Sequence, residues 1–350
     1  MSIGKRLIAT EAAADTDLFK GILYTGDAGT DNGVTGVGFT PDMVWVKQRV
    51  GETDHLLFDV VRGAGAGKSL SSNATYSEGL YDAAYGFVKS FDSDGFTVSR
   101  GTSAPFSAVY TNATSGTDGY VGWCFKAGGS VSAGNNTVGD ITSTVSANPD
   151  AGFSIVEYTP AGGGSVYTNT VGTGLTSAPE IIIQRMVSNT GDWYVHTDLI
   201  DGSNDYLVLN SSAAKADNIH NFAVTSTTFT DWGWNGNKMI NYCFHSVSGV
   251  SKMGKYTGST SGVTENVGFQ PSMVIIKNAT QSDPWGIFDS LRPSGTGNRS
   301  YLYPSTLDDE DAYSGSLSGI TLTSTGFAID NANSNMINEN GQTFLYMAFK

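Results

Sequence analysis

Two short segments of the chain combine a carboxylate with a guanidinium at a fixed spacing. Phe58-Asp59-Val60-Val61-Arg62 and Phe288-Asp289-Ser290-Leu291-Arg292 both follow the pattern Phe-Asp-x-x-Arg. Such a pair can grip a ligand or a partner, or it can form a local ion pair that fixes the turn after a strand. Because ligand sites are seldom duplicated so completely, we predict structural ion pairs between Asp59 and Arg62 and between Asp289 and Arg292.

The residue pattern gives little support to other catalytic chemistry. The histidines His55, His196, His220 and His245 lie in unrelated contexts, without a nucleophile elbow or a Cys–His signature. Zinc-ligand spacing is missing as well. The glycine-rich stretch at residues 63–69 fails the spacing of a phosphate-binding loop, which needs four residues between its first glycine and Gly-Lys-Ser. We therefore expect no catalytic residues, no cofactor and no metal centre.

Acidic clusters are further candidates for an ion or a hydrolytic site. The run from Asp308 to Asp311 (Asp-Asp-Glu-Asp) offers oxygen ligands that suit Ca²⁺, but it lacks EF-hand spacing, and a solvated acidic loop is the favoured alternative. Asp92 and Asp94 flank a turn and are typical turn formers. The two carboxylates of a glycosidase meet only in three dimensions, so the sequence leaves that alternative open.

Tryptophans give the strongest binding signal. Trp193, Trp232, Trp234 and Trp285 lie in or next to expected loops, where they could stack on sugars or form a subunit contact. Trp232 and Trp234 share one turn. Anchoring in a core or an interface is favoured over glycan binding, and we take the four rings as candidate loop contacts.

A strand signature that occurs three times must position these side chains. Residues 38–47 (Gly-Phe-Thr-Pro-Asp-Met-Val-Trp-Val-Lys) return at 268–277 and, more divergently, at 178–185. Each version has a turn with a proline, then a β-branched or aromatic run closed by a basic or polar residue, which predicts a strand with its entry turn. Phe39 matches Phe269 at an offset of 230 residues (269 − 39), and Arg62 matches Arg292 at the same offset. The chain therefore contains an internal repeat.

The composition agrees with short strands joined by many turns. Charged residues make up 15% of the chain and glycine 44 of its 350 residues. We predict an all-β fold of three tandem antiparallel β-sandwich-like repeats with a short N-terminal arm. The expected division is an arm at 1–20, repeat 1 at 21–127, a Gly/Ser/Asn linker at 128–150, a divergent repeat 2 at 151–250 and repeat 3 at 251–350. If the repeats are independent, a fragment of residues 251–350 should fold alone.

The last strand of each expected repeat leads to two more predictions, one about burial and one about the cysteines. Side chains alternate along residues 120–126, which predicts a half-buried strand. Cys124 and Cys243 occupy equivalent places in two repeats. Buried free thiols are expected there, and the sequence leaves a bridge between them open.

Charge and hydropathy exclude several classes of partner. Asp and Glu number 33 against 19 Lys and Arg, which gives a net charge of −14. Such a surface repels phosphate backbones, so we expect no nucleic-acid partner. No stretch approaches the roughly 18 apolar residues of a membrane helix, and the N-terminal residues lack a signal-peptide pattern. We expect synthesis in a cytoplasm and no membrane insertion.

The successive motifs resemble a known family. They are Gly-Phe-x-Pro-x-Met-Val-Trp-Val-Lys, His-Leu-Leu-Phe-Asp-x-Val-Arg-Gly, Phe-x-Ser-Asp-Gly-Phe-Thr-Val and Tyr-Val-Gly-Trp-Cys-Phe-Lys-Ala-Gly. Together they resemble a repeat domain of unknown function in virion proteins of tailed bacteriophages, commonly labelled tail fibre or virion structural protein. The resemblance extends over nearly the whole chain from Gly21 on, and it is close in repeats 1 and 3 and weak in repeat 2. It implies a location in the phage particle, and it supplies no catalytic residues because the chemistry of the family is not established.

The expected function is a non-enzymatic structural component of a bacteriophage particle, in the tail fibre or baseplate or as a receptor-binding protein. The expected partners are other virion proteins, further copies of the chain in a homo-oligomer, foremost a trimer, and a host surface glycan. The expected localisation is the virion, assembled in the host cytoplasm. The alternatives are a capsid decoration or cement protein, and a carbohydrate-binding protein or glycan depolymerase that uses the tryptophan-rich loops.

Overall fold

The computed structural model is almost entirely antiparallel β-structure. It describes residues 18–104, 108–114, 119–160, 168–218, 222–234, 236–292, 301–310, 319–330 and 336–350. Within these residues the expected all-β class is confirmed, with one short helix, α1 (Asp82–Tyr85). None of the described helical residues forms a helix long and apolar enough to cross a membrane. The expected N-terminal arm lies outside the described residues as far as residue 17, and the first strand already begins at Phe19.

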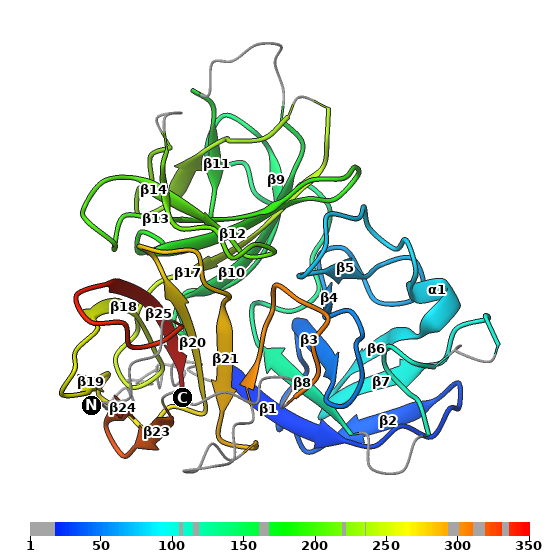
Figure 1. Ribbon diagram of the computed structural model, residues 1–350. Helices are drawn as coiled ribbons and strands as arrows, with labels where there is room; N and C mark the ends of the chain where they lie inside the picture. The colour runs from blue at the N-terminus through cyan, green and yellow to red at the C-terminus, as the bar shows by residue number, and fades with distance from the viewer. Residues whose placement is uncertain are drawn as a thin grey trace, which may run out of the picture.

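Three large antiparallel sheets form the framework (Figure 1). The first has the order β1-β8-β3-β4-β5, with β1 (Phe19–Tyr24), β8 (Tyr120–Phe125), β3 (Met43–Gln48), β4 (Leu56–Asp59) and β5 (Leu70–Ser71). The second has the order β15-β14-β13-β12-β17-β10-β9, with β15 (Ala216–Asp217), β14 (Asp205–Val208), β13 (Trp193–Thr197), β12 (Ile181–Met186), β17 (Met239–Phe244), β10 (Phe153–Tyr158) and β9 (Ser143–Asn148). The third has the order β18-β25-β20-β21-β22, with β18 (Ser251–Thr257), β25 (Thr343–Phe349), β20 (Met273–Asn278), β21 (Gly286–Asp289) and β22 (Tyr301–Leu302).

Three small sheets accompany the large ones. The first has the order β2-β7-β6, with β2 (Asn32–Thr35), β7 (Gly95–Ser99) and β6 (Phe87–Asp92). The second pairs β11 (Thr170–Gly172) with β16 (Thr228–Thr230). The third has the order β19-β24-β23, with β19 (Val263–Asn266), β24 (Gly326–Ile329) and β23 (Ile320–Thr323). Each small sheet lies with the large sheet of the same chain region in one of three lobes, coloured blue to cyan, green, and yellow to red in Figure 1.

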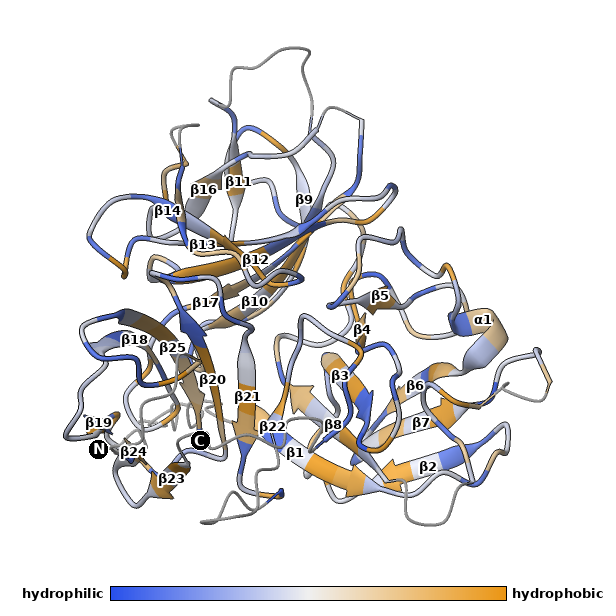
Figure 2. Cartoon of the chain, in the orientation of Figure 1, coloured by the Kyte–Doolittle hydropathy of each residue, from blue (hydrophilic) through white to orange (hydrophobic). Residues whose placement is uncertain are grey.

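A separate apolar core lies between the small and the large sheet of each lobe. In the first lobe, Val34 and Phe96 of the small sheet pack with Val44 and Phe58 of the large one. The second and third lobes have cores of the same kind, for example around Phe229 in the second lobe. We call these the peripheral cores. Figure 2 shows that the strands are largely hydrophobic and the connecting loops largely hydrophilic or neutral.

The opposite faces of the three large sheets meet in a fourth cluster, which we call the central core. It contains residues of all three lobes, among them Phe125, Phe244 and Phe349, the last residues of β8, β17 and β25. Their ring centroids lie 6.0 Å apart for Phe125 and Phe244, 5.2 Å for Phe125 and Phe349, and 5.6 Å for Phe244 and Phe349. Aromatic pairs at these separations add to the stabilisation that burial of their area provides. The lobes therefore share one core as well as having their own.

The central core corrects the expectation of a half-buried closing strand. Every residue of β8 is buried, because Val121, Trp123 and Phe125 enter the central core while Tyr120 and Cys124 enter the peripheral core of the first lobe. Alternation along the strand therefore separates two apolar environments instead of separating core from solvent.

The expectation of a linker at residues 128–150 changes, whereas the expectation of buried free cysteines is confirmed. The expected linker at residues 128–150 contributes β9, which pairs with β10 along its whole length. Cys124 and Cys243 are buried free thiols in different peripheral cores, so they do not form a bridge.

A fragment of residues 251–350 is expected to aggregate or to unfold without cooperativity. Its apolar face, with Met273, Ile275 and Phe349, is buried against the other two lobes and would become exposed. Circular dichroism melting and size-exclusion chromatography, with the intact chain as the control, would measure this. A soluble fragment with one sharp unfolding transition would show that the third lobe is stable by itself.

Candidate functional site

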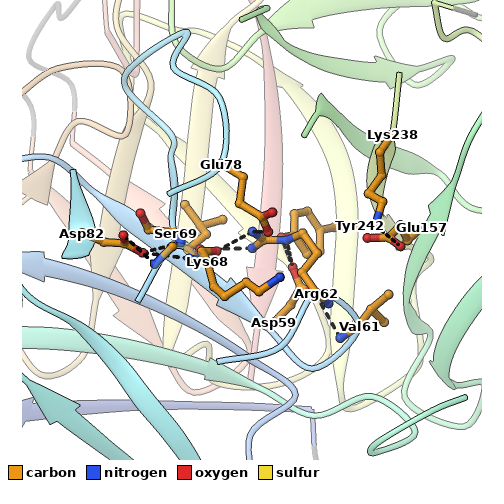
Figure 3. Close-up of polar contacts among 12 residues, drawn as sticks. Asp59, Val61, Arg62, Lys68, Ser69, Glu78, Asp82, Glu157, Lys238 and Tyr242 are labelled. Atoms are coloured by element: carbon orange, nitrogen blue, oxygen red, sulfur yellow. Dashed lines mark hydrogen bonds and ion pairs between the residues drawn. The ribbon is translucent and has the colours of Figure 1, made fainter. Parts of the chain in front are cut away.

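The Asp59–Arg62 pair forms and is buried at the end of β4 (Figure 3). Arg62 Nε donates to Asp59 Oδ2 over 2.6 Å, and the other Asp59 oxygen accepts the backbone N–H groups of Val61 and Arg62. The guanidinium also donates to Glu78 Oε1 over 3.1 Å. Burial lowers the pKa of Arg62, but the carboxylate of Asp59, with Tyr242 and Glu78, outweighs it and raises the pKa above its usual value. The pair thus fixes the turn after β4 and keeps the arginine charged.

The second pair repeats this geometry in the third lobe. Arg292 Nε donates to Asp289 Oδ2 over 2.8 Å, and Asp289 Oδ1 accepts the backbone N–H groups of Leu291 and Arg292. Both side chains are at most 1% exposed. The ring of Trp123 from the first lobe lies 5.4 Å from the Arg292 guanidinium, within the range of a cation–π contact.

Each of the two aspartates also accepts a hydrogen bond from another lobe. Tyr242 of β17 donates its hydroxyl to Asp59 Oδ2 over 2.7 Å. Trp123 of β8 donates its indole N–H to Asp289 Oδ2 over 3.0 Å. The carboxylates are therefore both turn formers and contacts between lobes, which the sequence pattern did not indicate.

The junction between the second and third lobes has neither the acceptor nor the donor of this polar contact. Thr197 is the last residue of β13, as Asp59 and Asp289 are the last residues of β4 and β21. Its neighbour His196 pairs with Ile182 of β12. Met347 of β25 pairs with Ile275 of β20, as Trp123 pairs with Trp45 of β3. An apolar side chain thus stands where the other closing strands carry a donor. Acceptor and donor are both absent at these positions, and the Thr197 hydroxyl donates to Glu180 O over 2.9 Å instead, so this buried polar group has its partner.

Buried basic residues near the ends of β3, β12 and β20 reach carbonyl oxygens of the next lobe. Lys47 Nζ donates to Leu307 O over 3.1 Å, Lys277 Nζ donates to Ser212 O over 3.1 Å, and Arg185 donates to Tyr76 O. The first lobe contacts the third, the third contacts the second, and the second contacts the first. These three contacts close a ring around the central core, and we call them the closing contacts.

Burial changes the acidity of the same side chains. It lowers the pKa of Lys47 to about 8, against the opposing effect of Asp309 and Asp54. It also lowers the pKa of Lys277 to about 8, and Asp283 opposes this shift. The pKa of Arg185 falls to about 10 for the same reason. The two lysines therefore titrate near pH 8 instead of above pH 10.

Two of the candidate tryptophans belong to the lobe junctions and not to exposed loops. Trp193 donates its indole N–H to Ser71 O of the first lobe over 2.8 Å, and Trp285 donates to Val208 O of the second lobe over 3.0 Å. Both are almost completely buried in the central core. Their expected role as exposed loop contacts is wrong, because the adjacent lobe covers Trp193 at the start of β13 and Trp285 just before β21.

The other two candidate tryptophans differ in exposure. Trp232 is buried in the peripheral core of the second lobe, with its ring centroid 4.4 Å from that of Tyr194, so its expected role as an exposed loop contact is wrong. Trp234 is 46% exposed, with its ring 6.1 Å from that of Trp232. Trp234 is thus the member of the four whose ring is open to a partner.

The acidic and glycine-rich segments make internal contacts. Glu310 accepts a hydrogen bond from Arg49 of the first lobe and is buried, while Asp311 lies outside the described residues. The backbone N–H groups of Gly67, Lys68 and Ser69 donate to the carboxylate of Asp82 over 2.8 to 2.9 Å. Those donors serve a carboxylate of the chain itself. In the described part of the chain, no three His, Cys, Asp or Glu side chains are grouped to hold a metal ion.

A protein-family model matches residues 14–350 of the chain, which is nearly its whole length. The chain belongs to this family. It is described as Domain of unknown function (DUF7483). No curated protein and no solved structure matches the chain.

In this DUF7483 chain the polar residues with the most defined geometry connect lobes. The Asp–Arg pairs, the closing contacts and the buried tryptophans all lie where two lobes meet. What this arrangement does chemically is to satisfy polar groups inside a large apolar interface, which holds the lobes at fixed positions. The basic residue that ends each repeated strand signature was the sequence signal for the closing contacts, but its partner lies too far away in the chain to be inferred.

Tyr242→Phe is expected to lower the free energy of unfolding by about 1.5 to 3 kcal/mol, because it removes a hydrogen bond to a buried carboxylate. Met347→Leu is the matched control at the junction without such a bond, and a change below about 1.5 kcal/mol is expected there. Urea denaturation measures both. Equal effects of the two substitutions would show that the Tyr242–Asp59 bond does not stabilise the junction.

The stability of the protein is expected to rise between pH 8 and about pH 10 through the two buried lysines. In this range the unfolded chain binds more protons than the folded chain, because the folded-state pKa values of Lys47 and Lys277 are lowered to about 8. The double variant Lys47→Met, Lys277→Met should therefore gain less free energy of unfolding over this range, by about 1 to 3 kcal/mol.

Chemical denaturation at several pH values would measure the difference in slope. Lys20→Met, at an exposed position, is the matched control and should leave the slope unchanged. If the double variant kept the slope of the original chain, the two amines would not change protonation on folding in this range.

Proposed function

We propose that the chain consists of three tandem copies of one β-sandwich unit, which associate around a pseudo-threefold axis. The strand orders β1-β8-β3-β4-β5, β10-β17-β12-β13-β14 within the second sheet, and β18-β25-β20-β21-β22 support this. In each, the closing strand lies between the strand that opens the copy and the strand of the repeated signature. Equivalent residues also make the three closing contacts in one cyclic direction.

We propose further that the protein is a non-catalytic structural component of a bacteriophage particle, in the tail fibre or baseplate or as a receptor-binding protein. The observation that carries this proposal is the central core shared by all three lobes. A closely packed core shared by the three lobes would hold them rigidly relative to each other. A particle component that transmits force requires such rigidity. The resemblance to phage virion proteins agrees with this role.

The central core also makes a homotrimer unnecessary for threefold association. Three lobes inside one chain already provide a threefold association, and their closing strands are buried. We therefore include in the proposal that the purified chain is a monomer of 36.8 kDa and that its partners in the particle are other virion proteins.

Immunogold labelling of virions of the phage that encodes the chain tests the proposal. Label is expected on the tail fibres or the baseplate, with particles treated with pre-immune serum as the control. Regular label over the head would instead indicate a capsid decoration protein, and unlabelled particles would contradict a structural role in the virion. Light scattering of the purified chain gives the mass, and a mass three times that of one chain would contradict the monomer.

A further inference from the structure

A histidine stands at one lobe junction where the other two junctions have a tryptophan. Trp193, Trp285 and His55 lie four residues before the last residues of β13, β21 and β4, respectively. The two tryptophans donate their indole N–H groups to Ser71 O and Val208 O of the adjacent lobe. His55 occupies the corresponding place at the junction between the first and third lobes.

The carbonyl groups on the other side of the junctions also correspond. Ser71, Val208 and Tyr303 each directly follow the leucine that pairs with β4, β13 or β21 two residues before that strand ends. The backbone of Tyr303 acts on His55 as a hydrogen-bond acceptor, but Nε2 of His55 makes no hydrogen bond of normal geometry within the described residues. The histidine junction therefore lacks the well-formed bond that an indole N–H makes at the other two.

The junction holds the imidazole of His55 in its neutral form. The residue is fully buried, and its Nδ1 accepts the indole N–H of Trp45 over 3.2 Å. A ring nitrogen that accepts this bond carries no proton, so the proton of the neutral ring lies on Nε2. The ring of Trp123 stacks beside it, with 6.3 Å between centroids and 12° between planes. Both indoles therefore fix the position of the imidazole.

The charged groups that act on this ring are cations. Burial, together with the charges of Lys47 and Arg292, lowers the pKa of His55 well below its usual value. The backbone of Tyr303 opposes this shift without cancelling it. The imidazole is thus neutral at pH 7 while the junction is closed.

The carboxylates near this junction have other partners. Asp54 accepts hydrogen bonds from Asn73 and Tyr110. Asp289 accepts them from Trp123 and Arg292. Further carboxylates act on the ammonium group of Lys47, namely Glu52, Asp308 and Asp309. An imidazolium would find no free carboxylate among these groups.

We propose that His55 makes the junction between the first and third lobes an acid-sensitive closure of the ring of lobes. A proton on Nδ1 would set two N–H groups against each other, because Trp45 could no longer donate to that nitrogen. It would also add a buried positive charge near Lys47 and Arg292. Opening of the junction lets water reach the ring and removes both costs, so protonation and opening are coupled.

The other two junctions have no titrating group at this position, because Trp193 and Trp285 carry indoles. They are therefore expected to stay closed when the first–third junction opens. This behaviour belongs to the chain itself and does not depend on its proposed place in a particle.

Three backbone amides report on the junctions one by one. Each donates to a carbonyl oxygen of the adjacent lobe: Glu310 N–H to Arg49 O over 2.7 Å, Glu78 N–H to Val187 O over 3.0 Å, and Lys215 N–H to Ala279 O over 2.9 Å. The first bond crosses the junction of the first and third lobes, the second that of the first and second, and the third that of the second and third.

Amide hydrogen exchange of the full chain, measured by NMR at pH 7.5 and pH 5 and corrected for the intrinsic exchange rate, tests the proposal. One proton with a pKa of about 6.5 in the open state raises the opening constant by about thirtyfold over this range. This rise is expected at Glu310 and not at Glu78 or Lys215. Carboxylates with ordinary pKa values of about 4 stay largely ionised at pH 5 and contribute little.

His55→Gln takes up no proton in this range and should reduce the change at Glu310 to less than about twofold. His196→Gln is the matched control. It removes a second buried histidine, whose pKa burial lowers to about 3 and which stacks on Phe222 in the peripheral core of the second lobe. This control should keep the rise at Glu310.

Nitrogen chemical shifts of His55 in the original chain are a second measurement, and they should show the neutral Nε2–H tautomer at pH 7.5. The proposal is overturned if exchange rises equally at all three amides, if Glu310 shows no rise, or if His55→Gln keeps the rise. A charged ring or an Nδ1–H tautomer at pH 7.5 would overturn it as well. These measurements use the purified chain, so they are separate from the virion labelling that tests the proposed function.

Discussion

The structure depends on the burial of three sheet faces against each other in one central core. Sheets that are apolar on both sides need cover on both sides. A small sheet covers one face of each large sheet, and the other two lobes cover the opposite face. Phe125, Phe244 and Phe349 meet at the centre of this arrangement. Removal of any lobe would expose apolar faces of the other two, which is why the lobes depend on each other.

Polar groups inside so large an apolar interface must find partners, and this requirement sets the positions of the lobes. Lys47, Arg185 and Lys277 reach carbonyl oxygens of the adjacent lobe, and Trp193 and Trp285 do the same with their indole N–H groups. Hydrophobic burial is non-directional and would allow the sheets to slide. Hydrogen bonds have defined geometry, and their loss inside a core is costly. The apolar contacts therefore supply the stability, and the polar contacts supply the arrangement.

The sequence predicted the elements well and their association poorly, for identifiable reasons. The repeated turn-and-strand signature predicted β3, β12 and β20, because their pattern is local. The alternation in residues 120–126 was misread, since two apolar environments and a core-to-solvent boundary produce the same period. Trp193 and Trp285 were placed in or next to loops because Trp193 begins β13 and Trp285 directly precedes β21, and the segment that covers each lies more than 70 positions away.

Three lobes within one chain can differ in sequence, so each junction can differ, which three identical chains do not allow. The junctions at Asp59 and Asp289 have a charge-assisted hydrogen bond between lobes, while the corresponding position of the second lobe is Thr197, with Met347 in place of a donor. Thr197 and Met347 suit each other, because a buried donor at position 347 would meet no carboxylate at position 197. Differences among the lobes, more than their shared positions, are therefore the places where contacts can change without loss of the central core.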